Sequence, residues 1–250
     1  MEPLSIILLS ISLIAYSFLI MLSIQAVKRR QRREIMPDII LIPGRIYFFW
    51  NYKNGFLFPD IWTANPRGRL EPDNRMLPCI NIGQGTAKNI CIWWAFDILG
   101  FANLIMENDR GRLLRIKHIK DHICIDMLFP KNKYPAFPEN YSIAFSEKPY
   151  GEIAYLLPVN ISKNQEKIFL PKTYLTLLAL LYYIRHLNQS SGNIDPLKIP
   201  LCQLSLEYDD IEDTTYQAKY SVGLRDIEHY SEDPGPNRLF FSAVFEINRE

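Results

Sequence analysis

The sequence predicts a mainly β protein: one N-terminal transmembrane helix followed by an antiparallel β-sandwich with one accessory helix. Residues 4–27 are uncharged and mostly apolar, and several later segments alternate apolar and polar residues. A membrane-spanning helix needs about 20 apolar residues, and period-two alternation is typical of half-buried strands. Residues 172–187 carry the apolar positions of the accessory helix. We therefore expect a transmembrane helix at 4–27, a basic juxtamembrane linker at 28–38 and a soluble sandwich-like domain at 39–250.

A group of basic residues directly follows the apolar run and predicts its orientation. The N-terminal flank offers only the α-amino group and Glu2. A secretory signal peptide would instead carry its positive charge before a shorter apolar stretch. The positive-inside rule therefore predicts an uncleaved span in a bacterial inner membrane, with the N-terminus outside and the C-terminal domain in the cytoplasm. These residues, here named the basic cluster, either only fix topology or also bind the membrane surface. The basic cluster comprises Lys28, Arg29, Arg30, Arg32 and Arg33.

Composition narrows the classes of partner and cofactor. The chain has 28 basic and 27 acidic residues, so removing the basic cluster leaves the remainder mildly acidic. A nucleic-acid surface would show as a basic stripe, and none is present in the sequence. The four cysteines have no CxxC spacing, so a zinc site is not expected. We expect Cys91 and Cys202 to behave as small core hydrophobes, and we expect no cofactor and no metal.

The β domain is predicted from extended segments that turn residues separate. The clearest pair is 201–208 and 214–222, in which one face is apolar and the other polar. Residues 209–213, here named the acidic loop, join this pair as a hairpin. Segment 89–97 is apolar on both faces, which predicts a strand that is buried on both sides or covered by another element. The remaining expected strands lie at 39–42, 45–50, 76–82, 122–129, 152–157, 166–170 and 239–247.

The segment 172–187 predicts the accessory helix. It follows Pro171, and apolar residues occupy most of its circumference, but its apolar part is too short to span a bilayer. A helix that is hydrophobic all round must be covered. It either packs against the edge or mouth of the sandwich or docks on a partner. On the second interpretation, the candidate partner-binding residues are Leu177, Leu181, Tyr182 and Ile184.

A glycine-containing run is the most distinctive short motif of the chain. Residues 80–90 read I-N-I-G-Q-G-T-A-K-N-I, and Gly83 and Gly85 permit a tight turn between two strands. A phosphate-binding loop would be followed by a helix, whereas an Ile- and Trp-rich strand follows here. The run resembles an N-x-G-x-G-x-A-x-N-I pattern that recurs in uncharacterised bacterial membrane-anchored proteins. Segments 168–175 and 206–211 are similar to the same group. The resemblance implies one N-terminal helix and a β-rich domain, and it implies no activity.

Candidate catalytic groups are few. His118 and His122 are four residues apart, but their isoleucine-rich surroundings predict an extended backbone, on which one metal could not reach both side chains. The acidic loop has carboxylates that could bind calcium, but it lacks the glycine and ligand spacing of an EF-hand. The sequence has no G-x-S-x-G elbow. An aromatic cluster at 47–62 is expected in the core or, alternatively, at the membrane interface.

The functional prediction is a membrane-anchored cytoplasmic binding or scaffold module that is not an enzyme. Its expected partners are the lipid bilayer and a protein partner or further copies of the chain, without nucleic acid. A first alternative is a membrane effector, of the stress or phage-defence type, that oligomerises through its span and perturbs the bilayer. A second alternative is a hydrolase whose residues assemble only in space.

Overall fold

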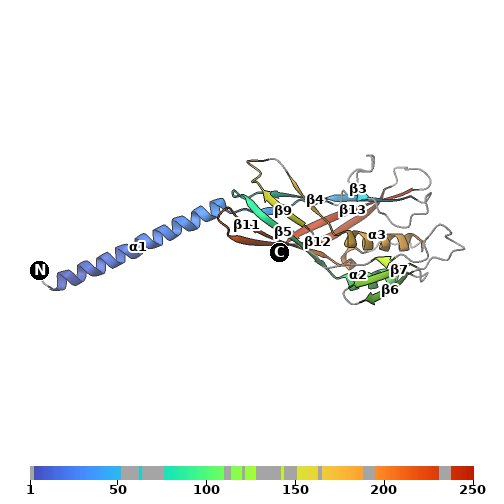
Figure 1. Cartoon of the computed structure of the whole chain (residues 1–250), viewed down its shortest axis with the longest axis horizontal. Helices are drawn as coiled ribbons and strands as arrows, with labels where there is room; N and C mark the ends of the chain where they lie inside the picture. The colour runs from blue at the N-terminus through green and yellow to red at the C-terminus, as the bar shows by residue number, and fades with distance from the viewer. Residues whose placement is uncertain are drawn as a thin grey trace.

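The computed structural model describes residues 3–51, 62–63, 76–109, 114–119, 122–127, 142–143, 151–162, 165–187, 195–230 and 238–250. In these residues the protein is mainly β, with antiparallel sheets and three α-helices. Helix α1 (Pro3–Ile35) projects away from one end of the β-rich domain, and helices α2 (Ile98–Asn108) and α3 (Lys172–Leu187) lie towards its other end (Figure 1).

Helix α1 spans Pro3–Ile35, a continuous helix of 33 residues. It contains the predicted span, and it continues through the basic cluster, where an irregular linker was expected. Arg, Lys, Gln and Glu are good helix formers, so residues 28–35 extend the helix and only residues 36–38 connect it to the first strand. Within the described part of the chain, no helix has the length and apolarity needed to cross a membrane.

A seven-stranded antiparallel sheet forms the body of the domain. Strands β11 (Cys202–Asp209) and β12 (Thr215–Tyr230) pair as the predicted hairpin, with Leu204 opposite Tyr220. Strand β12 runs beyond the expected end at Val222 as far as Tyr230, and it pairs there with β13. The strand order is β3 (Trp62–Thr63), β2 (Arg45–Asn51), β13 (Arg238–Arg249), β12 (Thr215–Tyr230), β11 (Cys202–Asp209), β5 (Ala87–Phe96) and β9 (Gly151–Leu156).

One face of this sheet is covered by two different elements. A three-stranded sheet of β1 (Ile39–Leu41), β4 (Met76–Asn81) and β10 (Glu166–Phe169) shares a buried core with β5, β9, β11 and β12. Farther along the same face, α2 (Ile98–Asn108) and α3 (Lys172–Leu187) share a second core with β12 and β13. The layer opposite the large sheet is therefore part sheet and part helix, because three short strands cannot cover the whole face.

Helix α3 has the predicted bounds, and its apolar surface faces the core. Leu177, Leu181 and Ile184 are fully buried, and Tyr182 packs partly buried against the same core. The structure thus places all four candidate partner-binding residues inside or against the core, because the sheet and α2 surround the helix. The packing interpretation describes α3: Leu177, Leu181 and Ile184 are inaccessible to a partner in this fold, and Tyr182 is partly exposed.

Helix α2 was not expected from the sequence. Asp97 caps its N-terminus by accepting a hydrogen bond from the Gly100 backbone N–H at 2.8 Å. Phe101, Ala102 and Ile105 are buried, at the spacing of one helix face. The preceding strand, β5, is also apolar. Asp97 is therefore the local signal in the sequence that marks the boundary between this strand and α2.

The second face of the large sheet is exposed along β5, β11 and the first part of β12, where its side chains are described. Ile90 and Ile92 of β5 point into the core, whereas Trp93 is 48% exposed and Ala95 is exposed on the other side. We expected this strand to be buried on both faces, and no described element covers the outer face. Polar residues of β11 and β12, such as Gln203 and Lys219, lie on this outer face.

Two further expectations change with the topology. The aromatic segment begins in β2, which pairs with β13 and β3 at the end of the domain far from α1 (Figure 1). An interfacial role for it next to the span is therefore not favoured. His118 and His122 lie on two strands of a hairpin, β6 (Leu114–Ile119) and β7 (His122–Met127), rather than on one extended strand. A third strand, β8 (Ser142–Ile143), pairs with β7.

Candidate functional site at the base of helix α1

Asn81 is a fully buried side chain that holds together the base of α1 and two strands. Its Oδ1 accepts hydrogen bonds from the backbone N–H groups of Asp38 and Gly83, each at 3.0 Å. Its Nδ2 donates to the carbonyl oxygens of Gly85 at 2.6 Å and Leu156 at 3.1 Å. Both the oxygen and the nitrogen of this buried amide are therefore hydrogen-bonded, as buried polar groups must be.

Residues 82–86, here named the glycine loop, pack backbone against backbone on residues 35–38, here named the junction. A Cβ added to Gly85 would overlap the carbonyl oxygen of Ile35, and one added to Gly83 would overlap that of Met36. Only glycine permits such a close approach. The N-x-G-x-G motif therefore forms the surface on which the C-terminal end of α1 packs, here named the seat. This role is additional to the hairpin turn expected from the sequence.

Other contacts fix the junction to the sheets. The Ile82 backbone N–H donates to the Asp38 carbonyl oxygen at 2.8 Å, and the Arg249 guanidinium pairs with the Asp38 carboxylate at 2.6 Å. The Tyr220 hydroxyl donates to the carbonyl oxygen of Ile39. Burial raises the pKa of Tyr220 to about 12, which keeps this hydroxyl protonated as a donor. The direction of α1 relative to the domain is thus set by hydrogen bonds on several sides.

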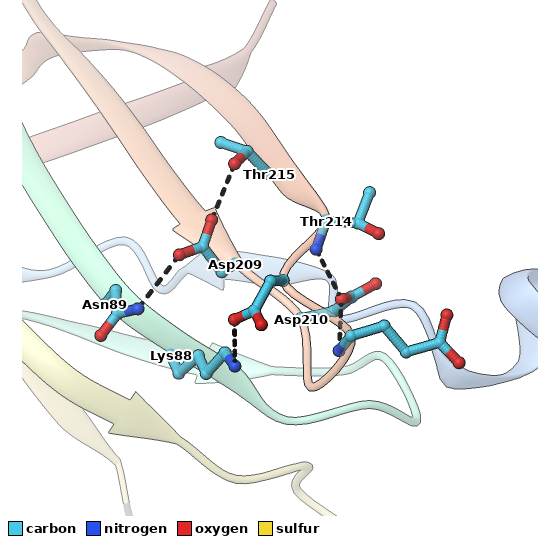
Figure 2. A network of polar contacts seen from close by, with 8 residues as sticks. Lys88, Asn89, Asp209, Asp210, Thr214 and Thr215 are labelled. Atoms are coloured by element: carbon cyan, nitrogen blue, oxygen red, sulfur yellow. Dashed lines mark hydrogen bonds and ion pairs between the residues drawn. The ribbon is translucent and has the colours of Figure 1, made fainter.

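The acidic loop lies at the same end of the domain, and its three aspartates have hydrogen-bond or ion-pair partners (Figure 2). Asp210 is buried, and its Oδ1 accepts from the backbone N–H groups of Glu212 at 2.8 Å and Thr214 at 2.9 Å. Burial alone would raise the pKa of Asp210, but these bonds and one from the Tyr216 hydroxyl outweigh it and lower the pKa below 3.8. The carboxylate acts as a turn cap, which is a structural role.

Two residues of β5 tie the acidic loop to the neighbouring strand. The Lys88 ammonium pairs with Asp213 at 2.6 Å, and the Asn89 amide donates to Asp209 at 3.1 Å. Asn89 has a positive φ of 53°, at a register shift between β5 and β11. The hydrogen bond from Asn89, followed by one from Thr215, lowers the pKa of Asp209. No group of three or more His, Cys, Asp or Glu in the described ranges could hold a metal ion.

The basic cluster occupies the last turns of α1, directly before the junction. Lys28 and Arg30 are exposed. The side chains of Arg29, Arg32 and Arg33 lie outside the described residues. The cluster is therefore held at a fixed position relative to the seat by one continuous helix.

Sequence reasoning identified the glycines and the basic cluster, but it missed what Asn81 does. The Asn81 side chain reaches Asp38 and Leu156, which lie 43 and 75 residues away in the sequence. The available signal was a polar residue at an inward position of a strand, directly before G-x-G. Only the arrangement of strands could show its distant partners.

The geometry at the base of α1 can orient a helix and transmit force to it.

Comparisons of this chain with protein-family models, with curated proteins and with solved structures found no match.

Proposed function

We propose that this protein is a single-pass inner-membrane protein whose cytoplasmic β-rich domain is a non-enzymatic binding or scaffold module. The observation that carries the proposal is the surface of α1. Large apolar side chains from Leu13 to Val27 are exposed at every angular position around the helix. A soluble monomer rarely exposes an apolar surface of that extent, and a helix that is hydrophobic all round belongs in a membrane or a large core.

The polar residues of α1 support the same proposal. The Ser17 hydroxyl donates to the Leu13 carbonyl oxygen at 2.8 Å, and Ser23 donates to Leu19 at 2.7 Å. These hydroxyls are therefore satisfied without water, as a span through hydrocarbon requires. As a helix, the apolar run of residues 4–27 would be about 36 Å long, compared with a hydrocarbon core of about 30 Å. This length supports the proposal, although no helix in the described residues meets the combined requirement of length and apolarity.

A binding role is supported by the open face of the seven-stranded sheet. Trp93 stands half-exposed there beside Ser205, with the polar side chains of Gln203 and Lys219 on the same face. Exposed aromatic residues surrounded by polar ones are common in protein interfaces. This face is the surface we propose for a protein partner.

The membrane-effector alternative is favoured by one specific observation, the tight seat of α1. Because backbone bonds and Asn81 hold the junction, association of the β domains would be transmitted directly into the spans. Forced dimerisation of the β domain through a fused inducible dimeriser tests this alternative. Growth arrest that disappears when residues 4–27 are replaced by an inert leucine span would favour the effector.

The experiment that tests the main proposal measures insertion and topology of the full chain. We expect the protein to resist carbonate extraction from bacterial membranes. A C-terminal green fluorescent protein should fluoresce, and a C-terminal alkaline phosphatase should be inactive, because both would lie in the cytoplasm. The control changes each basic-cluster residue to glutamine, which should weaken the preference for this orientation. Carbonate extraction of the unmodified chain, or an active phosphatase, would overturn the proposal.

A further inference from the structure

Five large apolar side chains are exposed at the end of the domain from which α1 leaves. Single exposed apolar residues are common on proteins, but these share one location. Ile161 is 67% exposed and Ile211 is 59% exposed. The complete set is Met36, Ile82, Val159, Ile161 and Ile211.

Printed contacts bring the segments that carry these residues together. Ile82 follows Asn81, whose backbone carbonyl accepts from the Val159 N–H at 2.8 Å. The Lys88–Asp213 pair ties the acidic loop, which contains Ile211, to the strand that follows the glycine loop. Figure 1 shows the loop between β4 and β5 and the hairpin of β11 and β12 beside the base of α1. The segments that carry the five side chains thus lie at the end of the domain from which the helix leaves.

Two of these residues occupy turns in which neither turn chemistry nor core packing requires an isoleucine. Ile161 lies in a turn closed by its own N–H and by that of Ser162, both donating to the Pro158 carbonyl. Ile211 lies in the acidic loop, beside the capping Asp210. Turns favour Gly, Pro, Asn, Asp and Ser. Isoleucines exposed at such positions indicate an apolar environment outside the domain.

The helix geometry places a bilayer next to this end. Residues 28–35 rise about 12 Å at 1.5 Å per residue, and the headgroup layer on each side of the hydrocarbon is about 5–8 Å thick. Because the helix is continuous to Ile35 and the junction is bound to the glycine loop, no flexible spacer separates the domain from the membrane. The base of an upright α1 therefore lies about 4–7 Å beyond the headgroup layer, so the loops around it face the headgroups across a short distance.

The charges around the apolar residues are compatible with a headgroup layer. Asp213 is paired with Lys88, and Asp38 is paired with Arg249. Asp209 accepts hydrogen bonds from Asn89 of β5 and from Thr215, and Asp210 accepts one from the Glu212 backbone N–H. The Glu212 side chain, next to Ile211, is exposed. The basic cluster, on the helix just before the junction, can attract anionic lipids at the same level.

We propose that this end of the domain docks on the bilayer surface, with Ile161 and Ile211 in contact with the lipid headgroups and Met36, Ile82 and Val159 beside them. The inference rests on the proposed membrane insertion of α1 and adds a second contact with the same membrane. The domain would then lie against the bilayer instead of standing free of it, and its open sheet face would be presented in a fixed direction.

Spin labels on the full-length protein in phosphatidylcholine vesicles, with and without phosphatidylglycerol, test the proposal. One label each is placed by Ile161→Cys, Ile211→Cys or, as a control on the exposed surface of α2, Glu107→Cys. Cys91 and Cys124 are first changed to serine. Cys79 and Cys202 are buried, and burial raises the pKa of the Cys79 thiol to about 12, so it is a poor nucleophile. The readout is the accessibility of each label to oxygen relative to a water-soluble nickel complex.

We expect the labels at 161 and 211 to be several-fold more accessible to oxygen, relative to nickel, than the label at 107. Equal nickel accessibility at all three sites, in vesicles that still retain the protein after carbonate, would overturn the docking and leave the span intact. Spin–spin broadening that unlabelled protein removes would also overturn it, because a second copy would then cover the patch. Extraction of the protein by carbonate would instead refute the span itself.

Discussion

At the scale of single residues, Asn81 shows how one buried amide can define a junction. Its four hydrogen bonds connect the strand that carries it to residue Asp38, to both glycines of the glycine loop and to Leu156. An exposed asparagine could exchange these partners for water. A fully buried one cannot, so its removal leaves buried backbone groups unpaired.

We therefore predict that Asn81→Ala lowers the free energy of unfolding of the full-length protein by about 2–4 kcal/mol. Chemical denaturation in detergent, followed by tryptophan fluorescence, measures the change. Asn160→Ala, at an exposed position of the same end of the domain, is the matched control and should change stability by less than about 0.5 kcal/mol. Equal effects of the two substitutions would contradict the role assigned to Asn81.

Asp210 gives a pH-dependent prediction at the same scale. Its folded-state pKa is lowered, so its contribution to stability is complete above 3.8, the ordinary value. That contribution is lost as the pH falls through the lowered folded value. We expect the stability of the unmodified protein to decrease as the pH falls below about 4, and Asp210→Asn to be less stable at pH 7 with a flatter acid profile.

The measurement is the free energy of unfolding between pH 7 and pH 2.5, compared with that of Glu212→Gln, which alters an exposed carboxylate of the same loop. Parallel curves for the unmodified protein and Asp210→Asn would show that Asp210 remains unperturbed by folding.

At the scale of elements, α3 shows why an apolar helix is not by itself a docking surface. The bounds and the apolar circumference of α3 were predicted correctly. Whether the helix packs against the domain or docks on a partner was left open. The large sheet and α2 supply the cover, with Phe101 and Tyr174 in an edge-to-face contact at 5.4 Å between ring centroids. The candidate residues Leu177 and Leu181 are core residues for this reason.

Leu181→Ala should consequently destabilise the domain by about 2–5 kcal/mol, the usual cost of a cavity at a buried leucine. Lys172→Ala, exposed on the same helix, serves as the control and should have little effect. Thermal and chemical unfolding of the two variants provides the measurement. A docking helix would give the opposite pattern, with stability unchanged and partner binding lost.

At the scale of the whole molecule, the important feature is the rigid connection between α1 and the β domain. The junction is short, the glycine loop contacts it through backbone atoms, and Arg249 near the C-terminus pairs with Asp38. These contacts join the beginning, middle and end of the sequence at one point. The direction of the helix is therefore a property of the complete fold.

Gly85→Ala should loosen this connection, because its added methyl group would overlap the Ile35 carbonyl. We expect amide hydrogen exchange of Asp38 and Ile82 to accelerate at least tenfold while exchange in α3 is unchanged. Gly44→Ala is the matched control, since its Cβ would lie 3.5 Å from the nearest atom, in the side chain of Leu77, at ordinary contact distance. Unchanged protection in Gly85→Ala would show that the glycine loop does not determine the seat.

Much of the fold was predictable because its signals are local. Period-two alternation located β11, the start of its partner β12 and most other strands to within one or two residues, and the apolar circumference located α3. The end of β12 lies eight residues beyond the expected Val222. The elements that were not predicted, or were predicted too short, also have local causes. Residues 98–108 are as apolar as the strand before them, so α2 was not separated from β5, and good helix formers in the basic cluster extended α1 through the expected linker.

The sequence alone determined the apolar run, the basic cluster, the alternating strands and the position of the glycine-containing turn, because each follows from local chemistry or spacing. Only the tertiary structure decided what the glycines of that turn face, which residues Asn81 joins, and that α3 is covered whereas one side of the large sheet is exposed along β5 and β11. These features depend on segments up to about 210 residues apart, as between Asp38 and Arg249, and on strand order. Local patterns do not encode such pairings, which arise when burial and hydrogen bonding are satisfied for the whole chain at once.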